Sequence, residues 1–145
     1  TGVINRIFHG YGKFEGEMDG RKNGALISMA TGKAVAFAIF NLQARGEMFV
    51  THNDPVYEGM IVGLAPKPGD MIINVMKGKQ LTNMRTQGTD ENVVLTPVRQ
   101  MSIAEQLSML NTDEALEITP KSLRLRKAIL NPNDRKKNEK SGTPL

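Results

Sequence analysis

Residues 56–76 read VYEGMIVGLAPKPGDMIINVM, and this stretch decides the fold class. Two short apolar runs, residues 56–62 and 71–76, flank a connection at 66–70 that contains two prolines and one glycine. Proline and glycine favour turns, so the two runs are predicted to be strands on either side of a tight connection. Strands of this length and spacing are typical of a small barrel or sandwich rather than of alternating βαβ units.

The same succession of apolar runs and turn residues continues on both sides of this stretch. The further runs predicted to be strands are residues 25–29, 34–40, 48–50 and 93–95. A single helix over 34–44 is an open alternative, because alanine, phenylalanine and leucine permit either structure. One helical turn at 42–45 is also possible, with Gly46 just after its end. We therefore expect a mainly β domain (α+β overall) that is β-barrel-like and has one or two short helices.

The N-terminal part of the chain has a different character. Residues 3–8 are predicted to form a short strand, and a glycine-rich stretch of mixed charge follows from Gly10 to Gly24. Such a density of glycine indicates a loop or an interdomain connection. We place a candidate domain boundary near residues 20–23.

The strongest local signal for a helix begins at Ser102. Glu105 follows three residues later, as in a capping box, in which the two side chains satisfy free backbone N–H groups at a helix start. Apolar residues such as Ile103 and Leu107 then recur at helical spacing. The sequence predicts a helix from 102 to about 111.

A strand pair is predicted after this helix, over residues 114–119 and 122–127, joined at Thr119-Pro120. Apolar and cationic side chains alternate in the second strand, in the order Leu123, Arg124, Leu125 and Arg126. Because successive side chains of a strand point to opposite faces, one face should pack and the other should present cations.

Charge is unevenly distributed along the chain. The net charge is +2 over residues 1–101, −4 over 102–118 and +6 over 119–145. Basic tails often bind polyanions, although a solvated surface explains them equally well. Asn131-Pro132 is suited to begin one more helical turn. Residues 133–145 are polar and basic, and we expect them to be disordered.

The motifs and residue arrangements typical of catalytic sites are missing. There is no cysteine, and no glycine stands five positions before Gly32-Lys33, as a phosphate-binding loop would require. His9 and His52 are the only histidines and have no carboxylates at metal-ligand spacing. No apolar run approaches the roughly 20 residues of a membrane span, and no secretory signal is recognisable. We expect a cytoplasmic protein that is not an enzyme.

Residues 77–91 lack any strand or helix periodicity, yet they lie between two predicted strands. Long irregular loops are usually functional or disordered. The composition suits RNA: cations for phosphates, amides and hydroxyls for ribose and base edges, and two apolar side chains for base faces. The open alternative is a flexible polar hairpin tip. The aromatic residues lie mostly in apolar runs, so we expect them in the core.

Several segments of the chain form a recognisable set: NGALIS (23–28), GKAVAF (32–37), VYEGMIVG (56–63), KGKQLTNMR (77–85), GTDE (88–91), TPKSLRLRK (119–127) and NDR (133–135). Together they closely resemble the C-terminal region of the TypA/BipA family of ribosome-binding translational GTPases, which are similar to elongation factor G. One departure is Gln80, where the family often has lysine.

This resemblance implies a division into residues 1–19, the end of a ferredoxin-like domain; 20–130, the family-specific C-terminal domain; and 131–145, a basic tail without an assigned role. GTP and magnesium would be bound by a domain preceding Thr1, so no cofactor is expected within these residues. The implied partners are the ribosome, large-subunit rRNA and the acceptor end of the A-site tRNA near the peptidyl-transferase centre. The implied processes are large-subunit assembly, stress and growth in the cold.

The expected RNA-binding residues are Lys77, Lys79, Gln80, Thr82, Asn83, Met84, Arg85, Arg124, Arg126 and Lys127. No catalytic or metal-binding residue is expected among the 145 residues. The alternative function is a protein-interaction module that docks through an acidic helix at 102–118.

Overall fold

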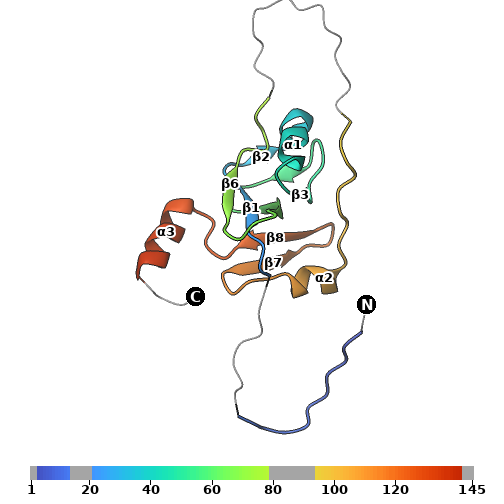
Figure 1. Cartoon of the computed structure of the whole chain (residues 1–145), viewed down its shortest axis with the longest axis vertical. Coiled ribbons are helices and arrows are strands. Elements are labelled where there is room, and N and C mark those ends of the chain that lie inside the picture. Colours follow the sequence, from blue (N-terminus) through green and yellow to red (C-terminus); the bar gives the residue numbers. More distant parts are fainter. Residues whose placement is uncertain (1–2, 14–20, 79–93, 142–145) are drawn as a thin grey trace, which may run out of the picture.

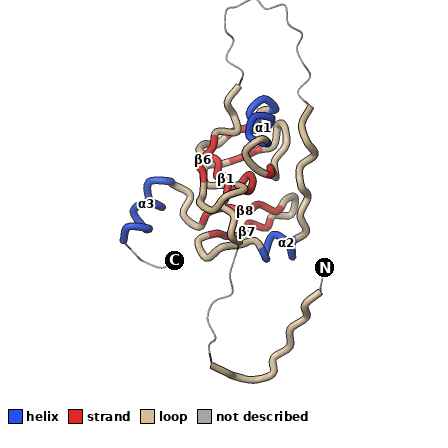
Figure 2. Tube along the Cα trace, in the orientation of Figure 1, coloured by secondary structure: helices blue, strands red, loops and turns tan. Residues whose placement is uncertain are grey.

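The structure is a computed structural model that describes residues 3–13, 21–78 and 94–141. Figures 1 and 2 show a small body built from short strands and three short helices. The elements in chain order are β1 (Ala25–Ser28), β2 (Gly32–Lys33), α1 (Ala36–Gln43), β3 (Glu47–Met48), β4 (Pro55–Val56), β5 (Ile61–Leu64), β6 (Met71–Ile73), α2 (Ile103–Ser108), β7 (Glu114–Ile118), β8 (Leu123–Lys127) and α3 (Pro132–Ser141).

A four-stranded sheet in the order β3-β5-β1-β6 forms the centre of the fold. Strand β5 runs antiparallel to β1 and β3, whereas β6 runs parallel to β1. Strands β1 and β5 are buried at every position. A sheet buried on both faces needs apolar residues on both, which is why these strands read as continuous apolar runs.

Two different layers cover the two faces of this sheet. Leu26 of β1 belongs to a core cluster with Ile39 of α1. Its neighbours in the strand, Ala25 and Ile27, belong to a second cluster with Leu125 of β8. Since adjacent strand residues point to opposite faces, α1 and the β7-β8 hairpin must lie on opposite sides of the sheet. Figure 1 shows this arrangement.

The predicted strand at 56–62 is interrupted, and a glycine explains why. Val56 ends β4 and Ile61 begins β5, while Gly59 between them has a φ of +84°. A Cβ atom at Gly59 would lie 2.7 Å from the Cα atom of Leu130. The backbone therefore turns at Gly59 and passes close to the backbone of Leu130. Both the positive φ and this close approach require glycine at position 59.

Residues 34–40 form no strand; the alternative of a helix is confirmed by α1. The His52 Nδ1 atom accepts a hydrogen bond from the backbone N–H of Ala36 at 3.2 Å and so satisfies one free donor at the helix start. Gly46 has a different role from the predicted helix terminator. A Cβ atom there would lie 2.2 Å from the backbone oxygen of Leu64, so Gly46 permits the close approach of β3 and β5.

The predictions for the segment after residue 101 are largely confirmed. Helix α2 begins with the complete capping box of Ser102 and Glu105, although it ends at Ser108. Strands β7 and β8 pair antiparallel in regular register. Leu125 is 3% exposed and faces the sheet, as the alternation predicts.

Two predicted strands are wrong. Residues 3–8 have no strand partner among the described residues, and Val3 and Ile7 are 89% and 92% exposed. Without a partner, an apolar segment cannot complete its backbone hydrogen bonds as a strand. Val94 and Leu95 are also irregular, and Val93 lies outside the described residues. The expected burial of aromatic residues fails for Phe8, Tyr11 and Phe40, which are exposed.

The expectation of disorder beyond residue 133 is wrong as far as Ser141, because residues 132–141 form α3. Asn131 caps this helix by accepting hydrogen bonds from the backbone N–H groups of Asn133 and Asp134. Proline at the first helical position favours the same start. No residue of α3 is buried, so local capping rather than core packing defines the helix.

The mainly β class is confirmed, with three short helices instead of one or two. In the described part of the chain the strands form separate small sheets and do not close into a barrel. The domain boundaries near residues 20 and 130 stay predictions.

Candidate nucleic-acid interface

Most of the predicted RNA-binding loop lies outside the described residues. This applies to Lys79, Gln80, Thr82, Asn83, Met84 and Arg85. Lys77, at the start of the loop, is described and exposed. It follows β6 and the buried Val75, so the sheet positions the point at which the loop begins.

Residues 94–101, which we call the return segment, lead from the loop to α2. Gln43 at the end of α1 forms two hydrogen bonds with the backbone of Thr96, one at 2.8 Å to its carbonyl and one at 3.1 Å from its N–H. Arg99 contacts Glu47 at 3.4 Å and Glu105 at 3.6 Å. The return segment is thereby held against α1, β3 and α2.

Arg124 and Arg126 lie on the β8 face opposite Leu125, and both are partly exposed. The Arg124 guanidinium is 3.8 Å from Glu117 on the neighbouring strand. Arg126 donates to the backbone oxygens of Lys127 and Ala128. Both side chains remain accessible to a ligand, as the sequence predicts.

Lys127 does not belong to this accessible face, which corrects the sequence prediction. It is 1% exposed, and its ammonium group contacts Asp70, Asp113 and Glu114 at 2.5, 2.7 and 3.0 Å. Strand alternation places Lys127 on the same face as Leu125, which points to the core. A buried ammonium needs carboxylate partners, and these three supply them.

The pKa values of this buried cluster reflect its ion pairs. Burial by itself lowers the pKa of Lys127, but hydrogen bonds to Asp113, Asp70 and Glu114 outweigh it and raise the pKa above its usual value. Burial likewise acts to raise the pKa of Asp70. The backbone N–H of Ala25 and the Lys127 ammonium reverse that effect and lower the pKa.

The acidic helix predicted at 102–118 is shorter in the structure, while the alternative function of docking through this segment stays a prediction. The helix ends at Ser108, and the acidic residues beyond it are engaged inside the domain. Glu114 is held by Arg21 at 2.7 Å as well as by Lys127. Glu117 accepts a hydrogen bond from the hydroxyl of Tyr57 at 2.5 Å. Glu114 and Glu117 therefore have partners within the domain, and the Glu114 side chain is fully buried.

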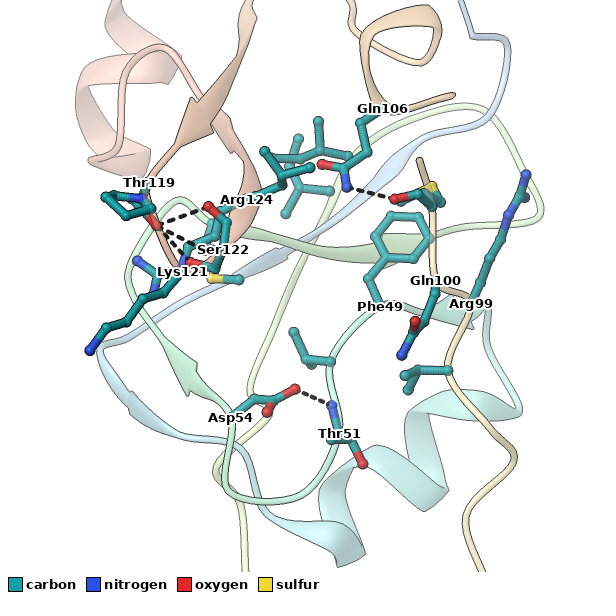
Figure 3. A pocket seen from close by; sticks show the side chains of 18 residues that line it. Phe49, Thr51, Asp54, Arg99, Gln100, Gln106, Thr119, Lys121, Ser122 and Arg124 are labelled. Carbon is teal, nitrogen blue, oxygen red and sulfur yellow. Dashed lines mark hydrogen bonds between the residues drawn. The ribbon is translucent and has the colours of Figure 1, made fainter. Parts of the chain in front are cut away.

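A cleft of about 720 Å³ opens between the tip of the β7-β8 hairpin, residues 49–54 and the return segment (Figure 3). Three cationic side chains line it, namely Arg99, Lys121 and Arg124, against one carboxylate, Asp54. Sequence reasoning identified only Arg124 of these residues. The cleft is formed by segments that are far apart in the sequence, so no local sequence pattern predicts it.

The hairpin tip that presents Lys121 is held by its own hydrogen bonds, which Figure 3 shows as dashed lines. The Thr119 hydroxyl donates to the Ser122 carbonyl at 2.9 Å and accepts from the Ser122 N–H at 3.0 Å. The Thr119 N–H also donates to the Ser122 carbonyl. These bonds close a tight turn around Pro120 and Lys121.

Among the described residues, no group of three or more His, Cys, Asp or Glu side chains is arranged so that it could hold a metal ion. None of the helices described in the structure is long and apolar enough to cross a membrane.

Fold and interface together define a small, mainly β module that presents cationic and polar side chains around an open cleft. A sequence model of the family described as TypA/BipA C-terminal domain matches residues 23–132. The chain belongs to this family.

Named relatives agree with this assignment. The large ribosomal subunit assembly factor BipA of Buchnera aphidicola subsp. Schizaphis graminum is 49% identical over 146 residues, which cover 100% of this chain and 24% of the relative. Proteins of the same name from Salmonella typhimurium and Escherichia coli are 46% identical over 138 residues, covering 94% of this chain and 23% of theirs. The chain thus spans about a quarter of the length of these curated relatives.

Proposed function

We propose that this chain is the RNA-contacting, non-catalytic domain through which a longer translational GTPase binds the large ribosomal subunit during its assembly. The observation that carries the proposal is the 46–49% identity, over nearly the whole chain, to proteins named as large ribosomal subunit assembly factors. The exposed cations around the hairpin tip support it, because neutralised RNA phosphates release bound counterions.

The principal contact in this proposal is the loop at 77–91. Lysine and arginine side chains bind phosphates, amide and hydroxyl groups bind riboses or base edges, and Met84 packs on a base. The proposed contacts are Lys77, Lys79, Gln80, Thr82, Asn83, Met84, Arg85, Arg124 and Arg126. Lys127 is omitted because its ammonium is already satisfied by three carboxylates.

The partners in this proposal are large-subunit rRNA and the acceptor end of the A-site tRNA, and the compartment is the cytoplasm. A role in stress and cold adaptation belongs to the same proposal. GTP and magnesium would be bound elsewhere in the longer protein, since Gly32-Lys33 is followed by alanine and lacks the glycine of a phosphate-binding loop. The 145-residue chain alone should therefore neither bind nor hydrolyse GTP.

The test is ribosome binding of the full-length protein over a salt series, with Lys77, Lys79 and Arg85 replaced together by alanine. The slope of log affinity against log salt should flatten by roughly 0.7–0.9 for each lost phosphate contact. The matched control replaces Lys136, Lys137 and Lys140 of the exposed helix α3, which removes the same charge elsewhere. Equal slopes for the loop variant and wild type would remove the loop as the site.

A further inference from the structure

We propose that the cleft at the hairpin tip binds a single unpaired nucleotide of an RNA strand, with the base on its apolar floor and the adjoining phosphates on its cationic rim. This inference rests on the proposed function, because it assumes that the domain faces RNA. It adds a second contact that is separate from the loop at 77–91. It also assigns a chemical role to Lys121, Phe49 and Gln100.

The size of the cleft suits one nucleotide. Its volume of about 720 Å³ lies within the roughly 300–1,000 Å³ of typical small-molecule sites. Its mouth is accessible, since the rim residues Arg99, Gln100 and Lys121 are exposed. A nucleotide that remains part of a chain can therefore enter while its neighbours stay outside.

The floor of the cleft offers an apolar surface with an aromatic ring. Phe49 and Met101 are partly buried and pack against the core cluster that contains Ile61 and Leu125. All four residues also line the cleft. Phe49 thus packs on the core and still borders the open space. Bases of single-stranded RNA stack on aromatic rings held in this way.

Polar groups that read a base edge or a ribose surround this floor. Gln100 and Thr51 line the cleft, and in the described part of the chain neither side chain has an intramolecular hydrogen-bond partner. Gln106 is 8% exposed and uses Nε2 to donate to the Met101 carbonyl at 3.2 Å, which leaves its Oε1 as an acceptor. Asp54 accepts from the Thr51 N–H and has a second oxygen for an amino or hydroxyl donor.

The cationic rim can hold phosphates on both sides of the base. In Figure 3, Lys121 and Arg99 lie on opposite sides of the cleft. Lys121 forms no ion pair with any described residue. Arg99 and Arg124 pair only at 3.4–3.8 Å with partly exposed carboxylates. Such exposed pairs are weak, so a phosphate can replace the carboxylate partners at little cost.

RNA accounts for this combination better than an acidic peptide does. An acidic peptide would also engage the cations, but a base offers both a flat face for the Phe49 ring and hydrogen-bonding edge groups for the neighbouring amide and hydroxyl side chains. The hairpin turn is also fixed in advance by the Thr119–Ser122 hydrogen bonds, so Lys121 is presented without ordering the backbone on binding. A single base with flanking phosphates uses every one of these groups.

The experiment uses the full chain and a short single-stranded RNA that contains one 2-aminopurine, whose fluorescence responds to stacking. Fluorescence anisotropy measures affinity, and 2-aminopurine emission measures stacking. Phe49→Leu should weaken binding by roughly 5- to 150-fold and abolish the emission change, while the salt slope stays the same. Lys121→Ala should lower the salt slope by about 0.7 and keep the emission change.

Two controls keep the test decisive. Lys136→Ala removes one exposed cation from α3 and should behave as wild type. An RNA hairpin without unpaired nucleotides, and the free nucleoside monophosphates, should bind more weakly than the single strand. Phe49→Leu must retain the wild-type melting profile; if it does not, Lys121→Ala and Gln100→Ala, both at exposed positions, decide the question alone.

The outcomes separate this inference from the proposed function. In one outcome, alanines at Lys77, Lys79 and Arg85 weaken single-strand binding, but Phe49→Leu, Lys121→Ala and Gln100→Ala have no effect. This result would overturn the proposed nucleotide site in the cleft and would leave the proposed loop contact standing. Tighter binding of an acidic peptide or of a free mononucleotide would also overturn the nucleotide site. A wild-type chain that binds no RNA at all would overturn both proposals.

Discussion

The Nζ atom of Lys127 lies 3.0 Å from Oε1 of Glu114, and the two side chains are only 2% and 0% exposed. The same Glu114 carboxylate accepts a hydrogen bond from Arg21 at 2.7 Å. Asp70, just before β6, contacts the same ammonium. One buried cluster therefore joins the segment before β1, the central sheet and the β7-β8 hairpin.

Replacing Lys127 by methionine should destabilise the domain by about 3–5 kcal/mol. Methionine fills most of the volume but removes the cation shared by buried Glu114 and the partly exposed Asp70 and Asp113, and weakly paired buried charge is costly. Urea unfolding measures the change. Arg126→Met removes a neighbouring cation that is partly exposed, and it should cost about 1 kcal/mol or less. Equal costs for the two variants would contradict the structural role of Lys127.

The stability of the domain should fall in acid because of Asp70. The folded-state pKa of Asp70 lies below its usual value of 3.8, so its contribution is fully present above pH 3.8 and is lost as the pH falls through the lower folded value. Unfolding free energies of wild type and Asp70→Asn, measured over acid and neutral pH, should differ at neutrality and converge in acid. A constant difference would mean that the carboxylate charge is unimportant.

Local signals in the sequence predicted local structure well. The capping box at Ser102 and the leucine–arginine alternation in β8 depend on residues only a few positions apart in the sequence. The interactions that stabilise these elements can therefore be recognised from the local sequence. The same alternation places Lys127 on the buried face. We nevertheless predicted Lys127 to be an RNA-binding residue; its partner Asp70 lies 57 positions away, so no local pattern reveals the buried ion pair.

Where tertiary contacts determine the local structure, the sequence pattern gave an ambiguous or a wrong prediction. Residues 34–44 permitted both a strand and a helix, and the helix is supported by a hydrogen bond to His52 from another segment. The cleft at the hairpin tip depends on Phe49, Arg99 and Lys121, which no sequence spacing connects. The contacts of the loop at 77–91 were predicted from composition and resemblance, and residues 79–93 lie outside the described structure.

Leu125→Ala should cost about 2–5 kcal/mol of unfolding free energy, whereas Arg124→Ala should be nearly neutral. Leu125 is 3% exposed in the cluster between the hairpin and the sheet, so truncation leaves a cavity. Arg124 is partly exposed and its pair with Glu117 is long, at 3.8 Å. Chemical denaturation of both variants measures the difference. A larger loss for Arg124→Ala would reverse the assignment of the two strand faces.

Tyr57 should titrate at unusually high pH. Burial, the hydrogen bond to Glu117 and the charge of that carboxylate raise its pKa to about 12. The protonated phenol thus stabilises the fold fully below its usual value of 10.0, and this contribution is lost as the pH rises through about 12. Ultraviolet absorbance of the Tyr11→Phe variant isolates this transition. Glu117→Gln should move the midpoint back towards 10.0, and an unchanged midpoint would contradict the pairing.

Deleting residues 132–145 should change the unfolding free energy by less than about 1 kcal/mol, because α3 buries none of its residues and short helices without packing are marginal in water. Deleting residues 129–145 should cost clearly more. That longer truncation removes Leu130, whose backbone passes against Gly59 at the positive-φ turn between β4 and β5. Thermal unfolding of the two truncated proteins gives the comparison, and hydrogen exchange of the intact chain should show faster exchange in α3 than in β8. A loss of several degrees on the shorter deletion would mean that α3 packs on the domain after all.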